Sequence, residues 1–258
     1  MKKISSFIFV AVLFFSCSQE DGFSSFPDAS TGVAGSYARF MIVGNFFYSI
    51  DDQKIRTFSL EKPELPELIN EQTIGQRIES IFNLGNRLFI GSGTGLFIYT
   101  IESDGIPKRA SQFSYEVFGT TPCDPVVATD SFAYVTLNSA ITNNCGRDRL
   151  IDLNQMVIFD VTNIEQPELI AEYPMELPKG IGVDGKTLFV CDDKAGLKIF
   201  DVTNPREIVS IAHFDTFTAF DVIPLDGLLL VVGPENVYQF DYSDLSNIRM
   251  ISQIPIEA

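Results

Sequence analysis

The sequence contains no tryptophan and a single histidine, and it has only 18 basic residues against 34 acidic ones. The formal net charge is therefore −16, and such a charge repels phosphate backbones and anionic lipid head groups. This argues against nucleic acid as a partner. The acidity is typical of a protein that stays soluble at a crowded cell surface; a dedicated site for basic partners is the alternative.

Patterns of metal centres and nucleophilic enzymes are also missing. His213 lies in "SIAHFDTF", with no serine or cysteine motif around it, and no close-spaced cysteine or histidine set suggests zinc. The glycine-rich stretch at 91–95, "GSGTG", is typical of a hairpin between strands rather than of a phosphate-binding loop that opens a helix. We therefore predict no catalytic residue, no metal and no cofactor.

The chain has only one long apolar run, and it is at the N-terminus. Lys2 and Lys3 precede a 12-residue apolar stretch, Ile4–Phe15, which is too short for a membrane span and indicates a signal peptide over 1–16. Ser16 followed by Cys17 resembles the cleavage point of a bacterial lipoprotein. The resemblance implies that Cys17 is acylated, for example with palmitate, and anchors the protein in the outer membrane.

The next residues, 17–35, are rich in Ser, Gly and Asp and predict a flexible tether. Acidic residues directly after the cysteine, in "SQEDG", resemble a surface-export tag, and a plain polar linker is the alternative. We expect a lipid-anchored protein that is exposed at the cell surface and has no other contact with the membrane.

A segment that recurs five times dominates the rest of the chain. An aromatic residue holds the same place in each copy, and consecutive copies are 41, 60, 41 and 40 residues apart: Phe58, Tyr99, Phe159, Phe200 and Phe240. A period near 41 is the length of one four-stranded propeller blade, which cannot bury its apolar faces alone. Phenylalanine is frequent, with 23 copies, and suits the narrow space between blades.

Turn residues recur within the copies. Short pairs stand between apolar runs and predict two-residue hairpins: Gly44-Asn45, Gly85-Asn86, Asp130-Ser131, Asp184-Gly185 and Asp226-Gly227. Prolines follow the in-register aromatic and mark a second turn. We predict an all-β propeller of about five four-stranded blades over 36–258, with the ring closed by pairing of the first and last copies. The copies are about 36–75, 76–116, 117–176, 177–216 and 217–258.

Two of these copies resemble a known repeat. "VIFDVTNIEQPELI" at 157–170 and "KIFDVTNPREIVSI" at 198–211 resemble the LVIVD repeat, which forms propellers and is common in lipoproteins of the Bacteroidota. The resemblance extends over about residues 36–258. It implies the propeller fold and a place at the cell surface, and it supplies no catalytic residue.

Three cysteines remain besides Cys17. In an exported chain a pair is expected to oxidise. Cys123 precedes the first strand of the third copy, and Cys145 lies in that copy's insert, so in a propeller both reach the same face. We predict a disulfide between them, which closes a loop and contributes roughly 3 kcal/mol. Cys191 ends a strand and is expected to be a small buried apolar residue.

The insert of about 19 residues in the third copy, "TLNSAITNNCGRDRLIDLNQ", is the one large departure from the repeat. Loops on a rigid scaffold often carry binding specificity, so its charged residues are contact candidates or, alternatively, solvated loop charges. These residues are Arg147, Asp148, Arg149 and Asp152.

A second candidate set stands near the start of the first strand of each copy: Arg39, Glu79, Asp124, Lys179 and Asp221. The innermost strands of a propeller line its channel, so these side chains could converge at one mouth and bind a ligand or form an acid–base pair. A network of internal ion pairs is the alternative.

These features predict a non-enzymatic surface lipoprotein, a binding or scaffold propeller that recognises a protein or a glycan. The competing hypothesis is a glycan hydrolase or lyase with its site at the channel mouth.

Overall fold

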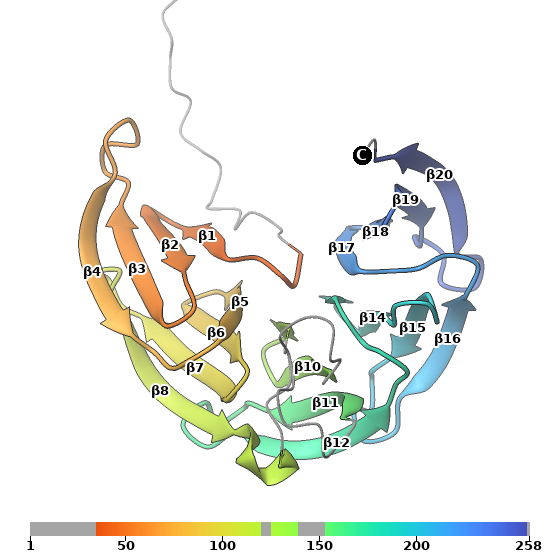
Figure 1. Ribbon diagram of the computed structural model, residues 1–258, viewed down its shortest axis with the longest axis horizontal. Helices are drawn as coiled ribbons and strands as arrows, with labels where there is room; N and C mark the ends of the chain where they lie inside the picture. The colour runs from red at the N-terminus through yellow and green to blue at the C-terminus, as the bar shows by residue number, and fades with distance from the viewer. Residues whose placement is uncertain (1–34, 120–124, 139–152, 257–258) are drawn as a thin grey trace, which may run out of the picture. The chain divides into compact units, whose positions relative to one another are not determined.

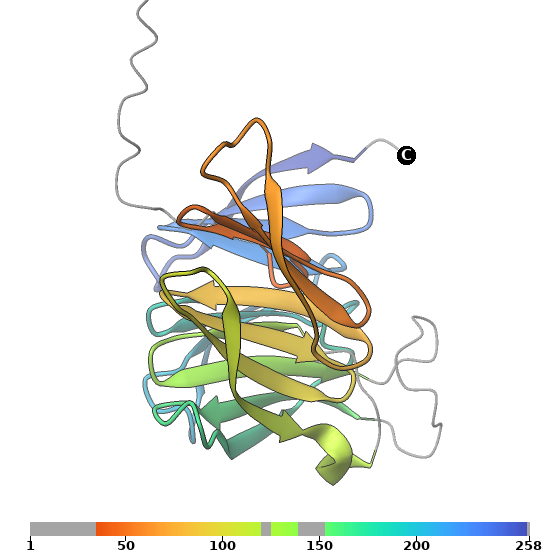
Figure 2. The same cartoon turned by 90° about the vertical axis from the view of Figure 1, so that its left-hand side faces the viewer.

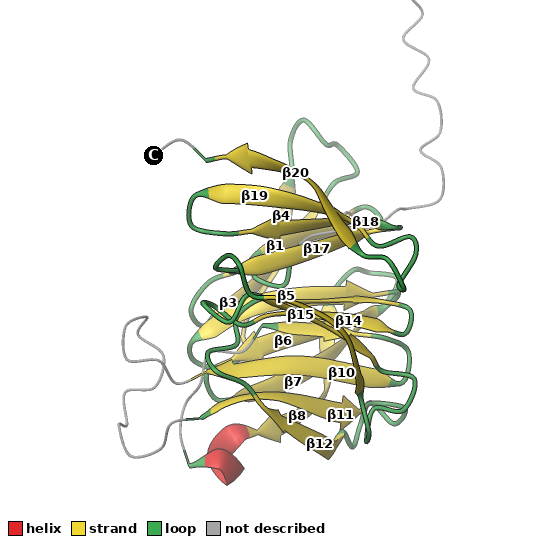
Figure 3. Ribbon diagram, turned by 90° about the vertical axis from the view of Figure 1, so that its right-hand side faces the viewer, coloured by secondary structure: helices red, strands yellow, loops and turns green. Residues whose placement is uncertain are grey.

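The computed structural model describes residues 35–119, 125–138 and 153–256. The chain divides into two compact units, 1–30 and 31–258, and every described residue belongs to the second. That unit is built almost entirely of strands, and the one helix among its described residues is a short 3₁₀ turn, η1 at Tyr115–Phe118 (Figure 3).

The strands form five antiparallel sheets of four, each made of consecutive strands, and we refer to these sheets as blades 1 to 5. Blade 1 contains β1 (Phe40–Val43), β2 (Phe46–Ile50), β3 (Lys54–Ser59) and β4 (Glu67–Thr73). Blade 2 contains β5 (Ile78–Leu84), β6 (Arg87–Ser92), β7 (Gly95–Ile101) and β8 (Pro107–Ser114). Blade 3 contains β9 (Val126–Ala128), β10 (Phe132–Asn138), β11 (Asn154–Asp160) and β12 (Glu168–Pro174).

Blade 4 contains β13 (Ile181–Asp184), β14 (Thr187–Cys191), β15 (Leu197–Asp201) and β16 (Val209–Phe214). Blade 5 contains β17 (Asp221–Leu225), β18 (Leu228–Val232), β19 (Asn236–Asp241) and β20 (Arg249–Pro255). The first strand of each blade lies innermost and the fourth lies at the rim (Figure 1), so the predicted propeller of five four-stranded blades is confirmed.

Hairpin turns join the first and second strands of the blades, where the sequence predicted them. Gly44 and Gly85 have φ values of 56° and 60°, and Asp226 and Gly227 have 47° and 89°. These left-handed conformations favour glycine, asparagine and aspartate, which explains why those residue types recur at the turns.

The in-register aromatic residues lie in the third strand of every blade, and each coincides with a β-bulge. The pairing between third and fourth strands shifts register directly before Phe58, Tyr99, Phe159, Phe200 and Phe240. A bulge increases the local twist of a strand, so the repeated aromatic marks the point where each blade bends.

Successive blades pack face to face through four apolar cores among the described residues. Tyr99 packs toward blade 1, Phe159 toward blade 2, Phe200 toward blade 3 and Phe240 toward blade 4. We call the side of a blade that carries this aromatic residue its leading face and the opposite side its trailing face. Each core therefore joins the trailing face of one blade to the leading face of the next.

The expected closure of the ring is wrong for the described residues. No sheet combines strands of the first and last copies, and the inner strands of neighbouring blades contact one another while β1 and β17 make no comparable contact. Figure 1 shows the ribbons of blades 1 and 5 apart, and Figure 2 shows the same blades from the side. Repeat length fixes the size of a blade, but the angle between blades depends on the side chains packed between them.

Candidate functional site

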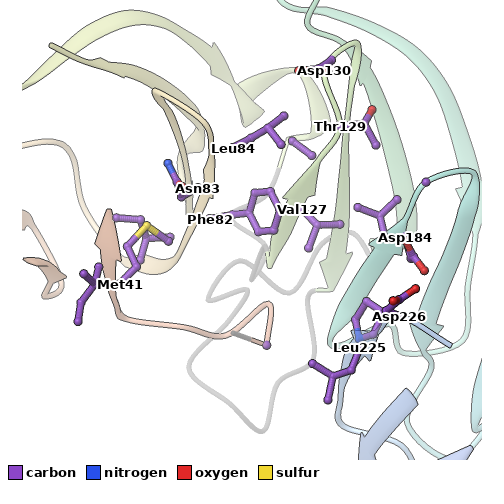
Figure 4. Close-up of a pocket in the computed structure, with 17 residues that line it drawn as sticks. Met41, Phe82, Asn83, Leu84, Val127, Thr129, Asp130, Asp184, Leu225 and Asp226 are labelled. Atoms are coloured by element: carbon purple, nitrogen blue, oxygen red, sulfur yellow. The ribbon is translucent and has the colours of Figure 1, made fainter. Parts of the chain in front are cut away.

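A cavity of about 820 Å³ lies between the inner strands of all five blades. We call it the central cavity; part of it is shown in Figure 4. Every blade contributes to its lining, and so does Gly35, which precedes blade 1. The blade residues are Met41 and Ile42 of blade 1, Ile81–Leu84 of blade 2, Val127–Asp130 of blade 3, Val183–Gly185 of blade 4, and Pro224–Asp226 of blade 5.

The walls of the central cavity are mainly apolar because each inner strand contributes alternating apolar residues. Met41, Phe82, Val127 and Leu225 all project toward the space between the blades (Figure 4). A concave, largely apolar pocket with a few polar groups is the usual form of a ligand site.

Three aspartates add negative charge where the inner strands end. Asp130, Asp184 and Asp226 belong to the hairpin turns of blades 3, 4 and 5, so the residues that shape the turns also give the cavity its charge. The Asp130 side chain is 89% exposed and forms an ion pair of 2.6 Å with Arg87.

Asp184 and Asp226 lie next to one another in Figure 4, and both act electrostatically on Tyr242. Tyr242 donates a hydrogen bond of 2.8 Å to Asp184 Oδ2. Burial, and after it the two aspartates, raise the pKa of Tyr242, so the tyrosine stays protonated as a donor. Asp184 is thereby held in place on the wall between blades 4 and 5.

The short turn before β1, residues 35–38, connects distant blades. Gly35 of this turn also lines the central cavity. The Ser36 hydroxyl donates to Asp221 Oδ1 at 2.9 Å and accepts from the Ile181 N–H at 2.9 Å. The Ala38 carbonyl accepts from the Ile81 N–H at 3.0 Å. Residues 35–38 therefore contact blades 2, 4 and 5 before the chain enters blade 1.

Gly35 allows this turn to approach Asp221. A Cβ atom at residue 35 would lie 2.1 Å from Asp221 Oδ2, which is too close for any side chain without movement of the aspartate. Gly35 was predicted to end the tether. No local pattern marks Ser36, whose two partners are 145 and 185 residues away in the chain.

The predicted channel residues lie at the opposite ends of the inner strands, and none of the four that are described lines the central cavity. Arg39 donates to the Ile78 carbonyl at 3.2 Å, and Lys179 pairs with Asp193 at 2.9 Å. Glu79 is in β5. Asp124 lies outside the described residues.

Asp221 is half-buried. Burial raises the pKa of its carboxyl, and hydrogen bonds from Val222, Ser36 and Tyr37 oppose the shift in part. Lys179 lies close to Phe220, the residue before Asp221. Its Nζ is 4.2 Å from the centre of the Phe220 ring. The carboxylate and the ammonium thus have separate partners, Ser36 and Asp193.

Several other predictions concern residues outside the described part of the chain. These are the acylation of Cys17, the disulfide between Cys123 and Cys145, and the contact candidates Arg147, Asp148, Arg149 and Asp152. Cys191 is described: it is a buried free thiol at the end of β14, as predicted, and burial raises its pKa.

No group of three or more His, Cys, Asp or Glu side chains within residues 35–119, 125–138 and 153–256 is arranged to hold a metal ion. In the same part of the chain, no helix is long and apolar enough to cross a membrane.

No family model matches the chain, and no curated protein is similar to it in sequence. Solved structures share its fold. A functionally unknown protein from Desulfotomaculum acetoxidans is 12% identical with a TM-score of 0.65, over 87% of this chain and 71% of that one. The periplasmic gluconolactonase PpgL of Pseudomonas aeruginosa is 13% identical with a TM-score of 0.59, over 85% and 69%.

KlAtg21, solved in complex with the coiled coil of AgAtg16, is 15% identical with a TM-score of 0.60, over 83% of this chain and 68% of that one. In eight of the matching solved chains, this chain spans between 58% and 71% of their length. At these identities the likeness concerns the fold alone, which hosts both an enzyme and a binding protein.

Proposed function

We propose that the protein is a non-enzymatic binding propeller that recognises a partner protein through its central cavity. The observation that carries the proposal is a cavity of about 820 Å³ lined by every blade, with apolar walls and three aspartates at the hairpin turns. Such a site suits an apolar group that bears a positive charge, as in a protein segment with lysine or arginine beside apolar residues. A neutral glycan has no positive charge to pair with the aspartates.

The cell-surface part of the proposal rests on the N-terminal sequence and on the resemblance to LVIVD lipoproteins. We propose that Cys17 is acylated and holds the propeller at the outer membrane. Labelling cells with an alkyne analogue of palmitate should mark the wild-type chain, and Cys17→Ser should abolish the label. A labelled Cys17→Ser chain would contradict the lipoprotein assignment.

Dye binding tests the chemistry of the cavity. Thioflavin T is a cationic aromatic dye, and anilinonaphthalene sulfonate is an anionic aromatic dye of comparable size. We expect the chain to bind the cationic dye more tightly, and the double change Asp184→Asn with Asp226→Asn to weaken that binding on the order of tenfold. Equal affinity for both dyes, or no effect of the double change, would refute a cavity that selects cations.

Asp215→Asn is the matched control, because Asp215 is exposed and does not line the cavity. It removes one negative charge without altering the site, so affinity for the cationic dye should stay close to that of the wild type. Asparagine at position 184 can still accept the Tyr242 hydrogen bond, which separates a loss of charge from a loss of structure.

The enzyme hypothesis, a glycan hydrolase or lyase, requires an acid–base pair among Glu79, Asp124 and Asp221. We favour the binding role because Asp221 does not line the cavity and its carboxyl is occupied by Ser36 and Val222. Glycan turnover that is lost in Asp221→Asn while the chain stays folded would support the enzyme hypothesis instead.

A further inference from the structure

The leading face of blade 1 is an exposed apolar surface. Phe40, Ile42 and Leu68 are 63%, 52% and 50% exposed. Ile42, Phe47, Phe58 and Leu68 form one row across the four strands of the blade, and the Phe47 ring lies 6.0 Å from Phe40 and 5.8 Å from Phe58. Contiguous exposed apolar residues of this kind mark interaction surfaces.

The corresponding rows in the other blades are covered by the preceding blade. Tyr99 and Leu88 of blade 2, and Phe159 and Ala133 of blade 3, are buried at these positions. The leading face of blade 1 is therefore one half of an interface that the chain forms four times elsewhere.

The trailing face of blade 5 is the other half. Leu230 pairs with Gln239 across β18 and β19, at the position where Phe89 pairs with Ile98 in blade 2. Phe89 and Ile98 are fully buried against blade 3. Leu230 is partly exposed, and Ile254 on the same face is 51% exposed.

A polar position of the interface is repeated as well. In blade 2, the Ser111 hydroxyl donates to the Ile164 carbonyl in the proline turn of blade 3. Ser252 holds the equivalent place in blade 5, because it pairs with Gln239 as Ser111 pairs with Ile98; within one molecule its hydroxyl donates to Gln239 Oε1 at 2.6 Å. Pro63 of blade 1 corresponds to Ile164, because each stands five residues after the in-register aromatic of its blade.

We propose that blade 5 of one molecule packs against blade 1 of a second copy of this chain, head to tail. The contact would continue the interface already formed four times between blades, with a trailing face on a leading face. The two faces differ from each other, so the association is heterologous and leaves one free end face on each side of a pair. Within one molecule, Ser36 in the turn before blade 1 donates a hydrogen bond to Asp221 of blade 5.

Sedimentation velocity of the full chain over a range of concentrations tests this proposal with two variants. Phe40→Asp places a charge on the leading face of blade 1, and Leu230→Asp places one on the trailing face of blade 5. Neither residue lines the central cavity, so the result is independent of ligand binding. We expect the wild type to associate with rising concentration and each variant alone to weaken association on the order of 100-fold, because a buried unpaired charge is costly.

Mixing the two variants gives the decisive result. Each retains one intact face, so a head-to-tail contact predicts a one-to-one dimer that grows no further. A monomeric wild type at all concentrations would overturn the proposal, as would a mixture that stays monomeric. A Leu230→Asp chain that still dimerises would show a symmetric contact between two blade 1 faces, which also overturns it.

Val209→Asp is the matched control. Val209 is 60% exposed on β16 of blade 4, outside both end faces, and the change introduces the same charge. Association should be unchanged in this variant. Circular dichroism of all three variants should match the wild type; association that is lost equally in Val209→Asp would mean nonspecific apolar contact and would refute the head-to-tail interface.

Discussion

At the scale of single residues, Ser36 connects blades that are far apart in the sequence. It is almost fully buried and its hydroxyl satisfies both a carboxylate of blade 5 and a backbone N–H of blade 4. Through these two hydrogen bonds, Ser36 connects the start of blade 1 to blades 4 and 5, which share no sheet with blade 1.

Ser36→Ala should therefore lower the free energy of unfolding by about 1–3 kcal/mol, since it leaves the buried Ile181 N–H without an acceptor. Ser210→Ala, on the exposed side of β16, is the matched control and should change stability by less than about 0.5 kcal/mol. Urea unfolding of both variants gives the comparison. Equal stability of the two would mean that Ser36 does not hold the blades together.

Asp221 should make stability depend on pH. Burial raises the pKa of its carboxyl in the folded chain above the unfolded value, so the folded state binds the proton more tightly. The contribution of the aspartate to stability is then full at low pH and decreases as the pH rises through the folded pKa.

Asp221→Asn cannot ionise and serves as the reference for this effect. The stability of the wild type relative to this variant should fall as the pH is raised from below 4 toward neutrality, and then level off. Urea unfolding at a series of pH values measures the difference. A difference that grows with pH would show that the hydrogen bonds from Ser36, Tyr37 and Val222 outweigh burial.

At the scale of the strand and the blade, the repeated aromatic residue is the main packing group. Phe159 is fully buried between blades 2 and 3 and meets Phe113 in an edge contact with 4.8 Å between ring centres. Phe58 has the same place in blade 1 but belongs to none of the apolar cores between the described blades.

Phe159→Ala should cost about 3–5 kcal/mol of unfolding free energy, and Phe58→Ala should cost less than half as much. Both are measured at a concentration where the chain is monomeric, so that a second copy covers neither residue. A loss at Phe58 as large as that at Phe159 would mean that blade 1 is covered within its own molecule.

The repeated elements explain what the sequence could predict. Period, in-register aromatics and turn pairs such as Gly44-Asn45 depend on neighbours within about 40 residues, and they predicted five four-stranded blades. The candidate site was harder to predict: residues at the strand starts were chosen, whereas the cavity is lined from the strand ends, including the turn aspartates Asp184 and Asp226. Those aspartates were recognised only as turn residues.

Ring closure and the role of Ser36 depend on contacts between residues far apart in the chain. Ser36 meets Asp221 across 185 residues, and no local pattern marks such a pair. Similarly, the repeat length does not determine the rotation angle between one blade and the next. The exposure of Phe40 and Ile42 follows from that angle and could not be read from an apolar strand alone.

At the scale of the whole described unit, the two proposed interactions involve different groups of residues. The inner strands of the blades surround a cavity with apolar walls and a negative rim, and the end faces remain unpaired at blades 1 and 5. Changes at Phe40 or Leu230 should alter association without altering ligand binding, and changes at Asp184 and Asp226 should do the reverse.

We propose to test the binding of a protein in the cavity with a photo-cross-linking amino acid at Val183, in the cells that produce the chain. Val183 lines the cavity, whereas Glu168 at the exposed rim of blade 3 is the matched control position. If a partner protein enters the cavity, position 183 should give one cross-linked protein that is absent from position 168 and reduced by Asp184→Asn with Asp226→Asn. No adduct at 183, or the same adducts from both positions, would contradict this proposal.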